Sequence, residues 1–277
     1  MGNRTQQYGK VILAGAGPGD PDLITIKAVR YLQQADVVLT DRLVSNEILE
    51  QYVNSDAEII YVGKQCRTGP STPQATINEL LVMHAAEGKL VVRLKGGDVS
   101  IFSNILDELQ TLAENKIPYE IIPGVTAALG SSAYTGIPLT ARGYSTAVRL
   151  LTFYKSDVVS PEYWKELAAT DDTLVFYMSS ETLSGVVENL VKNNIAPHKL
   201  LAVVEQATTP LQNVYTCSLY EYELAFRDRS FLSPSLIIIG KVVGLHEQFR
   251  WLENSGGREN YFTTLKNRVN VNQNLVA

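Results

Sequence analysis

Residues 10–21 read KVILAGAGPGDP, an apolar run that ends in a glycine-rich loop. Four consecutive apolar residues at positions 11–14, bounded by polar residues and glycine, are typical of a buried strand. The segment after the loop carries apolar residues at four-residue steps, the spacing of one helix face: Ile24, Ala28 and Leu32. A strand, a glycine loop and a helix in this order indicate the first unit of an α/β fold.

The same alternation continues to about residue 122. Further apolar runs occur at 37–40, 59–62, 90–94 and 119–122, and helical patterns lie between some of them. One helix face is marked by Ile77, Leu80, Leu81 and His84, and another by Ile105, Leu109 and Leu112. Strands that alternate with helices predict a mostly parallel sheet with helices on its faces.

The second half of the chain has a different texture. Candidate strands are 147–153, 173–177, 200–204, 212–217 and 235–240. The last three include closely spaced runs, which favours a mixed sheet with a hairpin. We therefore expect two α/β domains, residues 10–143 and 144–245, preceded by a polar arm (1–9). The polar tail (246–277) is either an interaction arm or, the favoured reading, a loosely ordered end.

Composition limits the class of protein. The chain has 277 residues, of which 45% are hydrophobic, as in globular proteins rather than disordered ones. A net charge of −5 without any Lys/Arg block argues against nucleic-acid binding. No apolar run is long enough to cross a membrane, and the start is polar, so a cytoplasmic enzyme is expected. Cys66 and Cys217 form no disulfide framework, and no His/Cys spacing predicts a metal site.

Glycine and charged residues gather where the first five expected strands end. The strand exits are residues 15–21, Asp41-Arg42, Gly63-Lys64, residues 95–98 and residues 123–126. In open α/β sheets, ligands bind outside the carboxyl ends of the strands. Several such exits at one edge predict a ligand site there. The exits at 177–179 and 205–210 are either further parts of that site or ordinary strand ends.

The loop at 15–21 is not a phosphate-binding loop. A dinucleotide fingerprint requires glycine at position 20, where this chain has Asp20, and Pro18 removes one backbone N–H. No Gly-Lys-Ser/Thr motif for a P-loop is present. In the second glycine loop, Asp98 has two open interpretations: it caps the following helix, or it meets an amine or ribose of a ligand. Both can hold at once.

Eight motifs in fixed order carry a family resemblance. They are GAGPGDP (15–21), TDRLV (40–44), YVGK (61–64), RLKGGD (93–98), IPGVTAA (122–128), GIPLT (136–140), LVFYM (174–178) and VVEQATTP (203–210). In this order they resemble the tetrapyrrole methylase superfamily over residues 10–245. The stretch at 41–44 points to its uroporphyrinogen-III C-methyltransferase branch.

The resemblance implies two α/β domains with a cleft between them, a homodimer, and S-adenosyl-L-methionine as methyl donor, released as S-adenosyl-L-homocysteine. It implies methylation of uroporphyrinogen III at C2 and C7, through precorrin-1 to precorrin-2, for siroheme or cobalamin (corrinoid) biosynthesis. By motif, Asp41 would be the proton acceptor and Lys64 the proton donor. The cofactor contacts would be Pro18, Gly96, Gly97, Asp98, Ile101, Thr126, Ala127, Met178 and Ala207, the last of which is glycine in the family.

A porphyrinogen substrate carries several carboxylates, so basic side chains are needed to hold it. Besides Lys64, the candidates are Arg42, Arg67 and Arg142. The chain departs from the family on this acceptor side, where an arginine is replaced by Asn104 and two histidines by Ala141 and Tyr154. Either other bases, such as Arg149 or Lys155, compensate, or the acceptor is a different precorrin. An alternative of another class is a nucleotide-binding module without methyl transfer, against which Asp20 and the missing P-loop lysine argue.

Overall fold

The computed structural model describes residues 9–63, 72–154, 159–227 and 229–262. The chain divides into two compact units: the first runs to Thr126 and takes in Phe262, and the second is Ala127–Tyr261. Each unit contains one five-stranded sheet. In the described part of the chain, no helix has the length and apolar character needed to span a bilayer.

The sheet of the first unit is entirely parallel, as expected. Its strand order is β3-β2-β4-β1-β5. The strands are β1 (Lys10–Gly15), β2 (Val37–Thr40), β3 (Glu58–Tyr61), β4 (Leu90–Lys95) and β5 (Tyr119–Ile122). Because all five strands point the same way, their carboxyl ends share one edge of the sheet.

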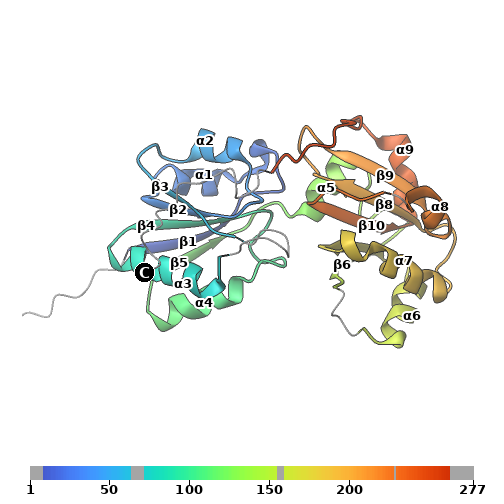
Figure 1. The fold of residues 1–277 in the computed structure, drawn as a ribbon, viewed down its shortest axis with the longest axis horizontal. Helices are drawn as coiled ribbons and strands as arrows, with labels where there is room; N and C mark the ends of the chain where they lie inside the picture. The colour runs from blue at the N-terminus through green and yellow to red at the C-terminus, as the bar shows by residue number, and fades with distance from the viewer. Residues whose placement is uncertain (1–8, 64–71, 155–158, 228, 263–277) are drawn as a thin grey trace, which may run out of the picture. The chain divides into compact units, whose positions relative to one another are not determined.

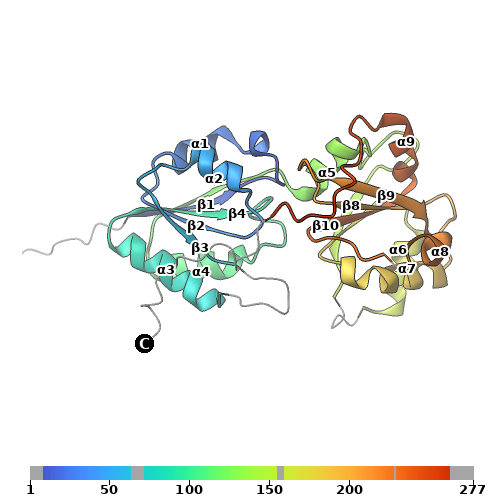
Figure 2. The same cartoon turned by 45° about the horizontal axis from the view of Figure 1, so that its top comes forward.

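Helices cover both faces of this sheet. They are α1 (Ile26–Leu32), α2 (Asn46–Tyr52), α3 (Gln74–Ala86) and α4 (Ile105–Glu114). In Figures 1 and 2, α1 and α2 lie on one face and α3 and α4 on the other. Successive strand residues point to opposite faces, so Ile12 packs toward α1 and α2, whereas Leu13 packs toward α3 and α4. The expected layered α/β architecture is thereby confirmed.

The second unit has a mixed sheet in the order β6-β7-β10-β8-β9. The strands are β6 (Val148–Thr152), β7 (Thr173–Tyr177), β8 (Leu200–Glu205), β9 (Asn213–Ser218) and β10 (Ser235–Gly240). β6 and β7 are parallel, β10 is antiparallel to both β7 and β8, and β8 and β9 form the expected hairpin. The carboxyl ends of β6, β7 and β8 therefore lie at the same edge.

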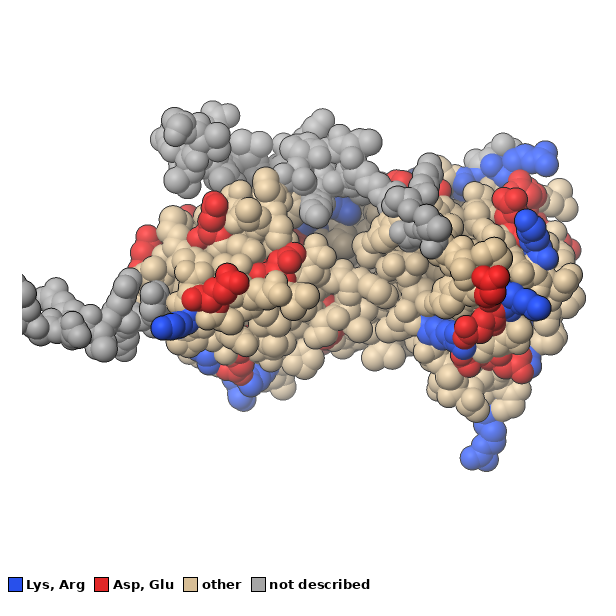
Figure 3. Space-filling view, turned by 90° about the horizontal axis from the view of Figure 1, so that it is seen from below, with Lys and Arg blue, Asp and Glu red and all other residues tan. Residues whose placement is uncertain are grey.

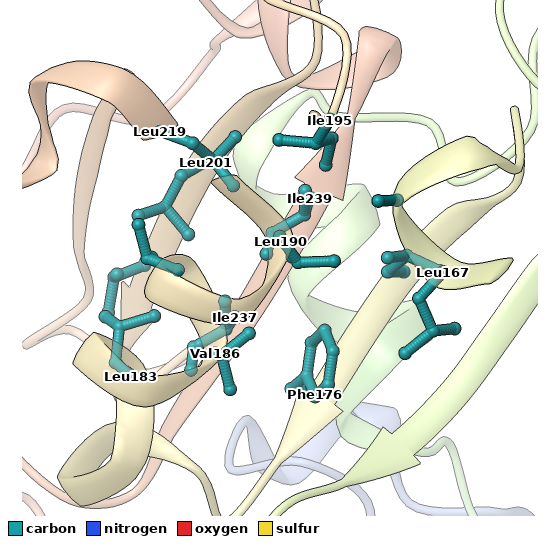
Figure 4. Packing of buried hydrophobic residues seen from close by; sticks show 14 of the residues in the cluster. Leu167, Phe176, Leu183, Val186, Leu190, Ile195, Leu201, Leu219, Ile237 and Ile239 are labelled. Carbon is teal, nitrogen blue, oxygen red and sulfur yellow. The ribbon is translucent and has the colours of Figure 1, made fainter. Parts of the chain in front are cut away.

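The core of the second unit lies on both faces of its sheet. Its helices are α5 (Ala127–Thr135), α6 (Pro161–Ala169), α7 (Leu183–Lys192), α8 (Tyr222–Phe226) and α9 (His246–Phe249). Figure 4 shows Phe176 and Ile237 of the sheet packed with Leu167 of α6 and Leu190 of α7, all of them buried. On the opposite face, Ala128 of α5 joins a second apolar cluster.

Two boundaries differ from those the sequence suggested. The division falls after Thr126 instead of near residue 143, because α5 and the segment that follows it pack in the second unit. Residues 246–261 of the expected tail belong to that unit. The His246 Nδ1 atom lies 2.6 Å from Thr135 O, and Trp251 Nε1 donates to Ala133 O at 2.8 Å. Residues 263–277 lie outside the described part.

Candidate active site

The loops after β1, β4 and β5 meet through their backbones. Gly17 and Gly97 exchange two N–H···O hydrogen bonds of 3.1 and 2.7 Å. A Cβ atom on Gly15 would lie 2.6 Å from Gly97 O, and one on Gly124 would lie closer still to the same oxygen. No side chain fits at such distances. Close contact between strand ends therefore requires these glycines, whichever ligand the edge binds.

Asp98 ties two of these loops together. Its Oδ1 accepts a hydrogen bond from Ser100 N at 2.8 Å, and its Oδ2 accepts one from Gly124 N at 2.9 Å. Helix α4 begins only at Ile105, after Asn104 in the left-handed conformation (φ 54°). The interpretation of Asp98 as the cap of that helix is therefore wrong: it closes the turn at Ser100. Contact of Asp98 with a cofactor stays a prediction.

Asp41 stands directly after β2, at the same edge. Its backbone N donates to Leu94 O at 3.2 Å, and its Oδ1 accepts a hydrogen bond from Arg93 Nη2 at 2.5 Å. A Cβ on Gly63, just after β3, would lie 3.7 Å from that Oδ1. The Asp41 side chain is 25% exposed. The carboxylate is thus held between the ends of β2, β3 and β4 while part of it remains open to solvent.

A chain of alternating charges runs inward from Asp41. Arg93 Nε donates to Glu108 Oε1 at 3.1 Å, and Lys95 Nζ donates to Glu108 Oε2 at 2.9 Å. Burial by itself would lower the pKa of Arg93, but the charges of Asp41 and Glu108 outweigh it and the pKa is raised. Burial lowers the pKa of Lys95, and the attraction of Glu108 offsets only part of that effect. All three inner side chains are almost fully buried.

The other expected site residues of the first unit fall into two groups. Pro18, Gly96, Ile101 and Thr126 lie in the loops after β1, β4 and β5, so the edge brings them together with Asp98. Arg42 lies half-buried beside Asp41. Lys64, Arg67 and Cys66 lie outside the described residues.

In the second unit, Met178 and Ala207 follow β7 and β8 at one edge. Met178 is left-handed (φ 52°) and half exposed, and Tyr154 Oη, after β6, lies 3.1 Å from its Sδ. Ala207 is flanked by Gln206 and Thr208, both of which also have positive φ.

Three hydrogen bonds hold this edge in place. The Gln206 side chain donates to Glu259 O at 2.9 Å and accepts from Tyr261 N at 2.6 Å. Ala127 opens α5, whose Ala128 N donates to Tyr177 Oη at 3.0 Å. The expected cofactor contacts Ala127, Met178 and Ala207 therefore share one edge of the second unit.

Arg142 is placed differently. It is exposed, in a turn closed by a bridge between Ala141 and Ser145. Ser145 Oγ accepts from Thr173 N at 3.0 Å, so this turn is anchored at the amino end of β7, the edge opposite Met178. The structure does not bring Arg142 to the edge that carries Met178, and its role as a substrate contact stays a prediction.

Arg149 was a candidate to replace a missing substrate base. It lies near the amino end of β6 and forms ion pairs of 2.6 Å with both Asp172 and Glu166. Lys155, the other candidate, lies outside the described residues. On the face in Figure 3, the visible basic and acidic side chains are interspersed. On the visible part of this face the basic side chains therefore form no continuous patch.

Sequence reasoning missed Arg93 and Glu108 as parts of the site. Arg93 lies in the RLKGGD motif, and Glu108 follows the stretch that departs from the family at Asn104, but neither residue was predicted to be part of the site. One signal was present: a charged residue stands inside an otherwise apolar strand, and such residues are rarely buried unless they are paired. The partners of Arg93 could not be read from the sequence, because Asp41 lies 52 residues away.

Comparison with protein families finds one match over most of the chain. The family described as Tetrapyrrole (Corrin/Porphyrin) Methylases matches residues 10–223. A siroheme synthase from Vesicomyosocius okutanii subsp. Calyptogena okutanii (strain HA) is 47% identical over 247 residues, which are 89% of this chain and 53% of that protein. The chain thus spans about half the length of the curated relatives it matches.

Several solved methyltransferase structures have a similar fold. The uroporphyrin-III-C-methyltransferase of Thermus thermophilus has a TM-score of 0.73 and 33% identity, covering 88% of this chain and 98% of that one. Its complex with S-adenyl homocysteine has a TM-score of 0.70 and 34% identity, covering 85% and 93%. A cobalt precorrin-4 methyltransferase has a TM-score of 0.75 and 28% identity, covering 84% and 95%.

Proposed function

Because the chain belongs to the tetrapyrrole methylase family, we propose that it methylates uroporphyrinogen III at C2 and C7, using S-adenosyl-L-methionine and giving precorrin-2 through precorrin-1. The observation that carries the proposal is the placement of Asp41, a partly exposed carboxylate held between the carboxyl ends of β2, β3 and β4. The similarity to the Thermus thermophilus enzyme along 98% of its chain supports the choice of acceptor.

The first unit suits a positively charged cofactor. Carboxylates stand in the loops after β1, β2 and β4, at Asp20, Asp41 and Asp98. They would repel a pyrophosphate but attract S-adenosyl-L-methionine, which carries a sulfonium and an ammonium group. Its activated methyl group is the chemistry that the cofactor supplies when bound. We assign its binding to Pro18, Gly96, Gly97, Asp98, Ile101 and Thr126 in the first unit, and to Ala127, Met178 and Ala207 in the second.

Methylation of a pyrrole carbon requires positioning and a base. The carbon–methyl bond forms as the sulfur–methyl bond breaks, and the macrocycle must then release a proton. Asp41 is the acceptor of that proton, because its carboxylate is held by a hydrogen bond from Arg93 and is partly open to solvent. Lys64 is proposed as the proton donor. Arg42, Arg67 and Arg142 are proposed to pair with substrate carboxylates, for which the planar guanidinium is suited.

A different precorrin is the second candidate for the acceptor. The cobalt precorrin-4 methyltransferase has a TM-score as high as that of the Thermus thermophilus enzyme. The positions that depart from the family, Asn104, Ala141 and Tyr154, were all expected on the acceptor side. Tyr154 now contacts Met178, an expected cofactor residue, so at this position the departure concerns the cofactor side as well.

One incubation separates the candidates. The protein is supplied with S-adenosyl-L-methionine and uroporphyrinogen III, and the products are analysed by mass. Addition of two methyl groups supports the proposal, whereas no addition to uroporphyrinogen III together with methylation of a later precorrin favours the second candidate. Thermal stabilisation by NAD but not by S-adenosyl-L-homocysteine would point to the nucleotide-binding alternative.

Two variants test the assigned roles. Asp41→Asn is expected to lower turnover by about 100-fold or more while S-adenosyl-L-homocysteine binding stays nearly unchanged, whereas Asp56→Asn, an exposed control, keeps both. Equal loss of turnover and binding would refute the role of Asp41 as base. Arg142→Ala should raise KM for the tetrapyrrole more than it weakens cofactor binding. If the affinities for the tetrapyrrole and for the cofactor decrease to the same extent, Arg142 is structural.

We further propose that the protein works as a homodimer in the cytoplasm and supplies siroheme or corrinoid synthesis. The support is the match to the tetrapyrrole methylase family. Light scattering coupled to gel filtration would measure the assembly, and a monomeric mass under assay conditions would contradict the dimer.

A further inference from the structure

Arg93 lies at the centre of β4 with only 3% of its side chain exposed. Each nitrogen of its guanidinium has a partner. Nε donates to Glu108, Nη2 donates to Asp41, and Nη1 donates to two backbone oxygens, Leu39 O and Leu94 O, at 3.3 Å each. The orientation of the guanidinium is therefore set by the strand backbone and by Glu108, independently of Asp41.

The location of Arg93 is not explained by packing. Its neighbours on the same face of the sheet, including Leu39 and Val91, belong to the apolar cluster under α3 and α4. At such a position an apolar side chain of similar volume is often as stabilising as a buried ion pair or more so. A buried arginine, together with Glu108 and Lys95 to balance its charge, is thus a costly arrangement for a purely structural purpose.

The hydrogen bonds of Arg93 also constrain the carboxylate of Asp41. Arg93 engages Oδ1 of Asp41, and within the described part of the chain Oδ2 has no hydrogen-bond partner. The backbone of Asp41 is tied to β4 as well, through Leu94 O. One oxygen is thus held by a fixed cation, and the other is left to exchange a proton.

We propose that Arg93 is a positioning residue for methyl transfer: held by Glu108, its guanidinium fixes Oδ1 of Asp41 and directs Oδ2 as the oxygen that accepts the substrate proton. This inference rests on the proposed function, in which Asp41 is the base. Arg93 touches neither substrate nor cofactor in this mechanism and acts only through Asp41.

The kinetic test is Arg93→Lys, which keeps the positive charge but cannot bond to Asp41 and Glu108 in the same geometry. The matched control is Arg250→Lys, since Arg250 also lies beside two carboxylates, Glu247 and Glu253, but in the second unit. We expect Arg93→Lys to lower kcat by about 10- to 100-fold. KM for uroporphyrinogen III and the Kd for S-adenosyl-L-homocysteine should stay within about twofold, and the control should keep kcat.

A double variant shows whether Arg93 acts through Asp41. Added to Asp41→Asn, the Arg93→Lys substitution should cost less than about twofold in the residual rate, measured in a single turnover. An equal loss in both backgrounds would overturn the inference. So would an unchanged kcat in Arg93→Lys, or parallel losses in kcat, KM and cofactor binding. If the wild-type protein fails to methylate uroporphyrinogen III, the proposed function fails instead.

A spectroscopic arm needs neither activity nor a folded Arg93 variant. In ¹⁵N-labelled wild-type protein the guanidinium of Arg93, bonded on every nitrogen, should give side-chain N–H signals protected from solvent exchange. Asp41→Asn should shift these signals and speed their exchange by about tenfold. Identical Arg93 signals in wild type and Asp41→Asn would show that the two side chains do not contact each other in solution, which would overturn the inference.

Discussion

Replacing Glu108 by glutamine should destabilise the first unit strongly. Glu108 is fully buried and accepts one hydrogen bond from Arg93 and one from Lys95, at 3.1 and 2.9 Å. Glutamine has the same shape but offers one oxygen and one NH₂ group, so one of the two cations meets a donor. Losing one charge-assisted hydrogen bond costs about 1.5–3 kcal/mol. Because a buried positive charge is also left without its partner, we expect a total of about 3–5 kcal/mol.

The loss should depend on pH through Lys95. Its pKa is already lowered by burial, and Glu108 offsets part of that effect. Without Glu108 the pKa falls further, so the unfolded state binds more protons than the folded state as pH rises toward 10.5. Stability then increases with pH in that window. The destabilisation of Glu108→Gln relative to wild type should therefore be smaller at pH 9 than at pH 6.

Urea unfolding followed by circular dichroism measures the overall loss in the free energy of unfolding. Because a chain of two units need not unfold in one step, amide hydrogen exchange in β4 measures the loss in the first unit separately. A loss of about 3 kcal/mol corresponds to roughly 150-fold faster exchange. Glu114→Gln, exposed on the same helix, is the control and should stay within about 0.5 kcal/mol of wild type. If Glu108→Gln is as stable as that control, the buried charge network does not exist in solution.

Three further results are expected. Hydrogen bonds, chiefly from Lys10, lower the pKa of Glu120 to about 2. The ionised form of Glu120 therefore contributes stability that is lost as pH falls from about 4.5 to 2. Glu120→Gln should flatten the curve of stability against pH in this range, and an unchanged curve would contradict the pairing. Burial raises the pKa of Cys217 to about 11. In the folded protein at pH 8, iodoacetamide should therefore alkylate the Cys217 thiol about 100-fold more slowly than a free thiol. Complete labelling of the peptide that contains Cys217 within minutes would argue against burial. In α7, Gly185→Ala adds a Cβ whose only close neighbour among the described residues is Phe153 Cε1, at 3.5 Å. The substitution should stabilise the helix by about 0.5–1 kcal/mol and so raise the Tm. A lower Tm would show that Phe153 cannot accommodate the methyl group.

Local patterns in the sequence were sufficient for most of the fold. The apolar runs predicted every strand, because a strand buried in a sheet needs consecutive apolar residues whatever its neighbours are. The long helix α3 was visible as a periodic apolar face. Helix α2, with only seven residues, was not, since so short a helix shows hardly two turns of periodicity.

The sequence by itself determined the α/β class, the glycine-lined strand ends and the family, all of which are written in contiguous residues. Only the tertiary structure decided that Asp41 is paired with Arg93, that Asp98 closes its own loop, and that residues 246–261 belong to the second unit. The physical reason is the same in each case. These outcomes depend on single contacts between residues far apart along the chain, as with His246 and Thr135. A buried polar group needs a hydrogen-bond partner, and only the folded structure shows which distant residue provides it.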